Sequence, residues 1–248
     1  MPRGEEPSSM QTMNDQEQLR QARERLIFAL DVPTAAKADE LVEELAGEVG
    51  CFKIGLELFI AAGPDFVRRV VARAPVFLDL KLHDIPATVE RATRVVDGLG
   101  VRYLTVHADL GGRSLAAAAA AAESTRVLAI TVLTSVAPED LSGIGLDPDV
   151  GALVERRARL AADCGCAGVV CSGLEASLVR RAAKELEVIT PGVRPAGGEA
   201  GDQSRVVTPA GAMQAGASAL VVGRPIRDAA DRVAAARAIV AEIAGALA

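Results

Sequence analysis

The regular alternation of short apolar runs with helical segments constrains the fold of this chain more than any other feature. Eight runs have the length and character of buried strands: residues 26–31, 51–54, 76–81, 103–107, 127–132, 168–171, 188–190 and 219–222. Amphipathic or alanine-rich segments typical of helices follow them: residues 35–45, 64–74, 86–99, 114–123, 150–164, 175–186, 208–215 and 229–247. This pattern predicts a single (β/α)8 barrel of the α/β class. A doubly wound open sheet stays possible, because the number of strands alone does not prove closure.

The composition agrees with parallel strands covered by helices. Half of the 248 residues are hydrophobic but only 2% are aromatic, so Ala, Val, Leu and Ile must fill the core. Such residues suit strands that are buried on both faces. We expect one barrel domain over residues 25–248. Residues 1–24 are polar and lack apolar periodicity, which indicates a flexible tail or a frayed helix.

Net charge and hydropathy argue against two classes of partner. The formal net charge is −6 and no basic cluster is present, so nucleic acid is not expected as the main partner. No apolar run reaches the ~18 to 20 residues that span a membrane, and the N-terminus lacks the apolar segment of a signal peptide. We therefore expect a soluble, cytoplasmic protein without a membrane partner.

The cysteines and histidines do not follow the pattern of a metal site. No two cysteines have CxxC spacing, and the two histidines, His83 and His107, lie elsewhere in the chain. We expect neither a metal nor a cofactor. Reduced, largely buried thiols of a cytosolic protein are the better interpretation of the four cysteines, which are Cys51, Cys164, Cys166 and Cys171.

Residues 77–86, with the sequence FLDLKLHDIP, are the most unusual local feature. They begin as a strand but carry Asp79, Lys81 and Asp84 where a buried strand would have Val or Ile. Residues two apart on a strand share a face, so Asp79 and Lys81 project together. Desolvating each charge costs several kcal/mol, so buried charges must be paired or functional. A structural salt bridge, with Asp84 at the next helix N-terminus, is the alternative, but three charges at one strand end favour a site.

Together with Asp79 and Lys81, further polar residues and two glycine-containing turns lie at or near the ends of predicted strands. In chain order these positions are Asp31, Lys53, Asp79, Lys81, His107, Thr131, Thr134, Ser172, Pro191, Gly192, Gly223 and Arg224. Barrel enzymes carry their sites at the C-terminal ends of the strands, so we expect these residues to converge on one mouth.

Two segments of that mouth have the composition of a phosphate site. Residues 190–194 (TPGVR) and 222–225 (VGRP) follow the seventh and eighth strands and combine exposed backbone N–H groups with a guanidinium. Barrels commonly bind a phosphoryl group at this place. The connection at residues 195–205 is long, polar and rich in glycine, which is typical of a mobile lid or of a simple surface loop.

Motifs along the whole predicted barrel point to one family. They are ALD at 29–31, KIG at 53–55, the DxKxxD pattern of Asp79, Lys81 and Asp84 followed by Ile85, Pro86 and Thr88, LTS at 133–135, PGVR at 191–194, GDQSRVVTP at 201–209 and VGRP at 222–225. In this order they closely resemble orotidine 5′-phosphate decarboxylase. The resemblance runs from about residue 25 to the C-terminus.

The resemblance implies a homodimer that decarboxylates orotidine 5′-monophosphate to UMP and CO2, the last step of de novo UMP synthesis. Lys53, Asp79 and Lys81 resemble three members of an alternating Lys-Asp-Lys-Asp array. Asp84 resembles the fourth member, which the partner subunit donates together with Thr88.

The substrate-binding residues are also implied by this resemblance. Asp31 resembles the acceptor of a ribose hydroxyl, and Thr134 the residue near the edge of the pyrimidine. Gln203, on the closing lid, resembles part of the phosphate grip together with Gly223 and Arg224. Pro191, Gly192 and Arg194 lie in the matching loop after the seventh strand. His83 and His107 are at family-like positions, but we interpret both as structural.

The residue types suit the implied chemistry. Loss of CO2 from C6 of orotate leaves a carbanion that needs preorganised positive charge and then a proton, and Lys81 can supply both. The alternative is a Mg2+-dependent 3-keto-gulonate-phosphate decarboxylase or hexulose-phosphate synthase, which shares the barrel and the DxKxxD strand. Those enzymes resemble one another in having an acidic metal ligand at the second strand, where this chain has Lys53. A cation there repels a divalent metal, which disfavours this alternative.

Overall fold

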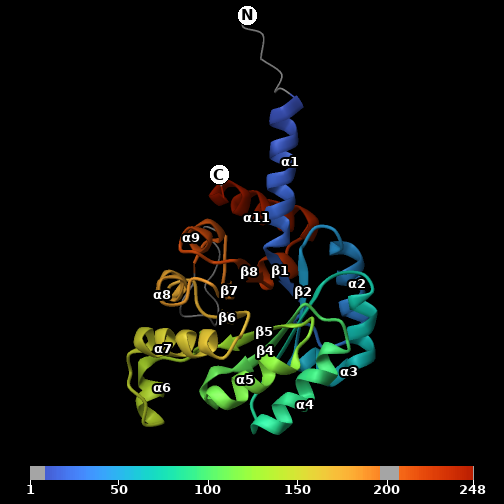
Figure 1. The fold of residues 1–248 in the computed structure, drawn as a ribbon. Helices are drawn as coiled ribbons and strands as arrows, with labels where there is room; N and C mark the ends of the chain where they lie inside the picture. The colour runs from blue at the N-terminus through green and yellow to red at the C-terminus, as the bar shows by residue number, and fades with distance from the viewer. Residues whose placement is uncertain (1–8, 196–206, 248) are drawn as a thin grey trace, which may run out of the picture.

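The structure, a computed structural model, describes residues 9–195 and 207–247 and contains a closed barrel (Figure 1). Its eight strands are parallel and pair in chain order, and β1 pairs with β8. The strands are β1 (Leu26–Ala29), β2 (Cys51–Gly55), β3 (Val76–Leu82), β4 (Tyr103–His107), β5 (Arg126–Ile130), β6 (Gly168–Val170), β7 (Glu187–Thr190) and β8 (Ala219–Val222). The predicted (β/α)8 barrel is confirmed, and the open sheet is excluded.

Helices surround the strands in Figure 1. They are α1 (Ser9–Glu24), α2 (Ala35–Leu45), α3 (Leu56–Val71), α4 (Pro86–Asp97), α5 (Gly112–Ala121), α6 (Pro138–Gly143), α7 (Val150–Asp163), α8 (Ala176–Ala182), α9 (Pro209–Gln214), α10 (Arg224–Arg227) and α11 (Arg232–Leu247), with a 3-10 turn η1 (Ala108–Leu110) after β4. The predicted helices at 35–45 and 150–164 agree with α2 and α7 within one residue at each end.

Burial follows the expected aliphatic pattern. Two large clusters of buried Val, Leu, Ile and Ala lie between the strands and the helices. A third cluster, which includes Phe77 and Tyr103, fills the barrel interior. The Phe77 and Tyr103 rings meet edge to face, with centroids 5.8 Å apart. The barrel interior is thus a packed apolar layer. A polar side chain at the end of the barrel would rest on this layer.

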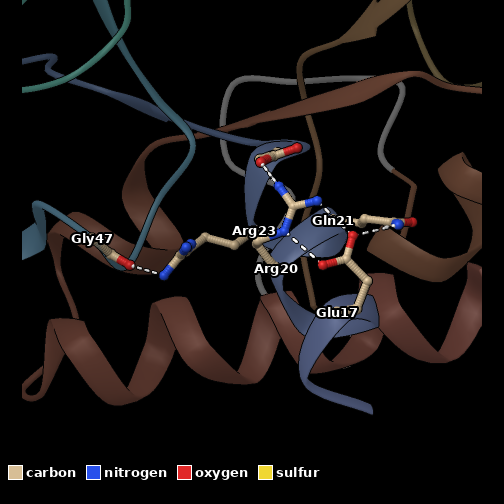
Figure 2. Close-up of polar contacts among 6 residues, drawn as sticks. Glu17, Arg20, Gln21, Arg23 and Gly47 are labelled. Carbon is tan, nitrogen blue, oxygen red and sulfur yellow. Dashed lines mark hydrogen bonds and ion pairs between the residues drawn. The ribbon is translucent and has the colours of Figure 1, made fainter. Parts of the chain in front are cut away.

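The polar segment before residue 25 contains helix α1 among the described residues. Helix α1 packs along α11, and Gln18 Nε2 donates a hydrogen bond to the Ala244 carbonyl at 2.9 Å. Figure 2 shows that Arg20 contacts Glu17, whereas Arg23 donates to the Gly47 carbonyl at 2.8 Å. Because residues three and four apart share a helix face, such pairs support a polar helix that lacks an apolar stripe.

Helix α3 begins earlier than the sequence predicted. We expected a helix at 64–74 because Pro64 suits a first turn, but α3 begins at Leu56. Gly63, with a non-helical φ of 70°, forms a kink between the first helical segment and the segment that begins at Pro64. Helices α6 and α10 were not predicted, because four to six residues are too short for apolar periodicity to show.

Candidate active site

A cavity of about 410 Å³ opens at the C-terminal ends of the strands, where barrel sites lie. Its size is within the ~300 to 1,000 Å³ typical of small-molecule sites. Residues with a predicted role that line it are Asp31, Lys53, Asp79, Lys81, Thr134, Pro191, Gly192, Arg194, Gly223 and Arg224. The structure therefore brings together polar groups from the ends of β1, β2, β3, β5, β7 and β8.

Three of these residues form an alternating array of charges. Lys81 Nζ donates a hydrogen bond to Asp79 Oδ2 at 2.8 Å, and Lys53 Nζ lies 3.7 Å from the same oxygen. Lys53 Nζ also donates to Asp31 Oδ1 at 3.2 Å, which adds a second carboxylate. Ala29, Phe77 and Val221 line the same cavity, so the array rests on the apolar interior of the barrel.

Asp79 is the buried centre of the array, with 8% of its surface exposed. Burial alone would raise its pKa, but the charges of Lys53 and Lys81 and the hydrogen bonds from Lys81 and Thr105 outweigh burial. The pKa of Asp79 therefore lies below its usual range, and the carboxylate is ionised at neutral pH. An ionised carboxylate here attracts the ammonium groups of both Lys53 and Lys81.

The backbone at Lys81 is held in a rare conformation. Its φ is 51°, and it is the one non-glycine residue with positive φ in the described chain. The pairing of β3 with β4 shifts register between Leu78 and Leu82, so the strand bulges where Lys81 lies. The Lys81 amide donates to Thr105 Oγ1 at 2.9 Å. Strained conformations of this kind cluster at active sites, where they aim a side chain that regular geometry would misplace.

The loops after β7 and β8 face the array across the cavity. Gly192 has a φ of 80°, a conformation that glycine adopts without strain, and it turns the chain after Pro191. Arg194 is buried at 7% exposure and lines the cavity from this loop, whereas Gly223 and Arg224 line it from the loop after β8. Gln203, the predicted lid residue, lies outside the described residues.

Asp84 and Thr88 do not line this cavity. Asp84 Oδ1 accepts a hydrogen bond from the Ile85 amide at 2.7 Å, and in the described ranges its carboxylate forms no ion pair. Asp84 is exposed, and Ile85 beside it has 65% of its surface exposed. Asp84 therefore lies on the surface of this chain, outside the cavity that Asp79 and Lys81 line.

Comparison with known sequences identifies the family. A model of the orotidine 5'-phosphate decarboxylase / HUMPS family matches residues 24–239. The chain belongs to this family.

Similar members of the decarboxylase family cover nearly the whole chain. The orotidine 5'-phosphate decarboxylase of Anaeromyxobacter sp. (strain K) is 52% identical over 221 residues, which are 88% of this chain and 97% of that protein. The one from Bradyrhizobium sp. (strain BTAi1 / ATCC BAA-1182) is 48% identical over 91% of this chain and 94% of its own. The crystal structure of the Lactobacillus acidophilus enzyme of that name is 32% identical, with a TM-score of 0.79 over 88% of this chain and 98% of its own.

The two histidines lie together beside this family's motif and outside the cavity lining. Their ring centroids are 5.3 Å apart, and Asp109 Oδ1 lies 3.8 Å from His83 Nε2 and 3.6 Å from His107 Nδ1. Burial lowers the pKa of His107 more than Asp109 raises it. No group of three His, Cys, Asp or Glu residues in the described segments could hold a metal ion.

Two further residues of the site were missed in the sequence. Thr105 lies in β4 two residues before His107, so strand periodicity places both on one face and could have identified it. Arg227 lines the cavity from the end of α10, and no motif singled it out. Three of the four cysteines are buried, as predicted: Cys51, Cys166 and Cys171. In the described part of the chain no helix is long and apolar enough to cross a membrane.

Proposed function

We propose that this chain decarboxylates orotidine 5′-monophosphate to UMP and CO2 without a metal ion. The observation that carries this proposal is the array of Lys53, Asp79 and Lys81 at the base of the cavity, held at 2.8 and 3.7 Å around one carboxylate oxygen. The relatives described above that are 48–52% identical to this chain are both named for this activity.

Lys81 performs the central step in this proposal. Departure of CO2 leaves a pair of electrons on C6, and an ammonium group already in place stabilises that charge without reorganisation. The same ammonium then donates the proton that replaces CO2. Asp79 orients the Lys81 side chain through their hydrogen bond, and in this proposal its own negative charge crowds the carboxylate of the substrate.

The cavity also offers groups for the rest of the nucleotide. Asp31 has an exposed carboxylate beside Lys53 that can accept a hydrogen bond from a ribose hydroxyl. Thr134 is proposed to lie at the edge of the pyrimidine. The phosphate is assigned to Gly223 and Arg224, supported by Pro191, Gly192 and Arg194 and, from outside the described residues, by Gln203.

The array is completed, in this proposal, by a second copy of the chain. Asp84 lies outside its own cavity and pairs with no described cation, so its carboxylate is available to a partner subunit. The exposed Ile85 adjoins it and gives the contact an apolar component. Asp84 and Thr88 would then enter the partner's site in a homodimer. The burial of Cys51 and Cys166 is in keeping with the cytoplasmic location that we propose.

The deciding experiment is an absorbance assay for loss of orotidine 5′-monophosphate in excess EDTA. Activity should persist, because Lys53 occupies the position where the Mg2+-dependent enzymes of this barrel group have an acidic ligand. Complete loss of activity that Mg2+ restores would contradict the proposal and favour a 3-keto-gulonate-phosphate decarboxylase or hexulose-phosphate synthase.

A further inference from the structure

Arg227 lies at the mouth of the cavity, but its guanidinium is already engaged by the protein. Its Nε and Nη2 donate to the two oxygens of Asp228 at 2.7 and 3.0 Å. Its Nη1 donates to the backbone carbonyl of Asp31 at 3.0 Å. Each of its three nitrogens therefore has an acceptor, and the side chain spans from α10, after β8, to the end of β1.

This geometry distinguishes Arg227 from a phosphate ligand. A fork of two hydrogen bonds to a carboxylate fixes the plane of a guanidinium and neutralises its charge. The hydrogen bond and the charge of Asp228 raise the pKa of Arg227, so the pair stays ionised. A phosphate would have to compete with Asp228, the next residue in the chain, for the guanidinium of Arg227. The guanidinium of Arg227 is thus not free to turn toward a phosphate.

The carbonyl that Arg227 holds belongs to a residue of the charge array. Asp31 follows the last residues of β1, and its carboxylate Oδ1 accepts the hydrogen bond from Lys53 at 3.2 Å. Asp31 Oδ2 also faces the loop after β8, because a Cβ added to Gly223 would lie 3.4 Å from it. A shift of the Asp31 backbone would therefore move its carboxylate relative to both Lys53 and Gly223.

Helix α10 is itself anchored from behind. Arg232 Nε donates to the Arg227 carbonyl at 2.9 Å, and Arg232 Nη1 pairs with Glu44 of α2 at 2.9 Å. The end of α10 is thus fixed to the outer helices while the Arg227 side chain reaches inward. The Arg227 side chain therefore links the end of α10 to the Asp31 backbone, in addition to the pairing of β1 with β8.

We propose that Arg227 is a positioning residue that couples the loop carrying Gly223 and Arg224 to Asp31, and through Asp31 to the Lys53–Asp79–Lys81 array. The inference rests on the function proposed above, because it assigns Asp31 to the substrate-binding site. It predicts that Arg227 influences turnover only while the Asp31 carboxylate is present.

A double-mutant cycle tests this dependence. The kcat/KM for orotidine 5′-monophosphate is measured for the wild type, Arg227→Gln, Asp31→Asn and the double variant. Loss of a hydrogen bond from a charged donor should lower kcat/KM about 10-fold or more in Arg227→Gln. In the Asp31→Asn background the same substitution should change kcat/KM by less than about twofold. Arg227→Lys, which can still reach one acceptor, should recover part of the loss.

Two controls make each outcome decisive. Arg237 forms a similar fork with Glu48 on the outside of the barrel, so Arg237→Gln should leave kcat/KM within about twofold of the wild type. Calorimetry with UMP and with uridine gives a second measurement, in which Arg227→Gln should weaken both ligands by the same factor. Losses that multiply in the double variant, or a weakened affinity for UMP alone, would overturn the inference. Absence of turnover in the wild type would instead refute the proposed function.

Discussion

The hydroxyl of Thr105 donates a hydrogen bond to Asp79 Oδ1 at 2.9 Å, on the carboxylate oxygen that the lysines do not contact. Thr105 is completely buried, and its oxygen also accepts the Lys81 amide at 2.9 Å. One neutral side chain of β4 therefore fixes both the carboxylate of Asp79 and the bulged backbone of Lys81.

Replacing Thr105 by Val should lower kcat without preventing folding, because Val keeps the shape but not the hydroxyl. A hydrogen bond to a charged group contributes about 1.5 to 3 kcal/mol, which corresponds to roughly a 10- to 150-fold loss. Thr105→Ser, the matched control, keeps the hydroxyl and should retain most of the activity. Steady-state kinetics give the comparison, and equal activity of the Val and Ser variants would show that the hydroxyl has no part in the site.

Lys81→Ala should abolish turnover while the barrel stays folded. The substitution removes the proposed proton donor from a side chain that is 29% exposed at the cavity, so little packing is lost. Circular dichroism would establish the fold, and the absorbance assay would give kcat. Retention of more than about a tenth of the wild-type kcat would mean that another group protonates C6.

Arg224→Ala should discriminate between the nucleotide and the nucleoside. Only the nucleotide would lose a charge-assisted contact worth about 1.5 to 3 kcal/mol, so its kcat/KM should fall much further than that of orotidine. The two substrates are compared on the same preparation. Equal losses for both would mean that Arg224 supports the fold and does not hold the phosphate.

A mixture of Lys81→Ala and Asp84→Ala chains should regain activity if sites are shared between subunits. In a mixed dimer one site receives both defects and the other has Lys81 and Asp84 intact. Random reassortment makes about half of the dimers mixed, so activity should recover to about a quarter of the wild type. Native mass spectrometry would verify reassortment. A verified mixture as inactive as its parents would place Asp84 in the site of its own chain.

The sequence was sufficient to predict the alternation of strands and helices, because strand length and helical periodicity are local properties, whereas closure depends on the pairing of β1 with β8. The end of β3 has one feature that the sequence predicted and one that it did not. Period-two geometry placed Asp79 and Lys81 on one face, and they are in contact at 2.8 Å. The positive φ of Lys81 was not predictable, because it arises from the register shift between β3 and β4.

Residues that act through contacts across the barrel were out of reach of local patterns. Arg227 contacts Asp31 although 196 positions separate them in the chain, and nothing near Arg227 signals that partner. Strand periodicity could place Thr105 on the same face as His107, but its hydrogen bond to Asp79 forms only when β4 lies beside the bulge of β3. The exposed position of Asp84, whose carboxylate accepts a hydrogen bond from the Ile85 amide, also did not follow from its spacing from Lys81.

The pairing of β1 with β8 has a consequence for how the chain reaches its native state. Leu26 lies opposite Leu220, so the first strand has no second neighbour until almost the entire chain has been synthesised. Until then the edges of β1 and of the latest completed strand present unpaired backbone groups and apolar side chains. Closure of the barrel therefore requires the last strand, and Lys53, Asp79 and Lys81 are all synthesised before Gly223 and Arg224, which follow that strand.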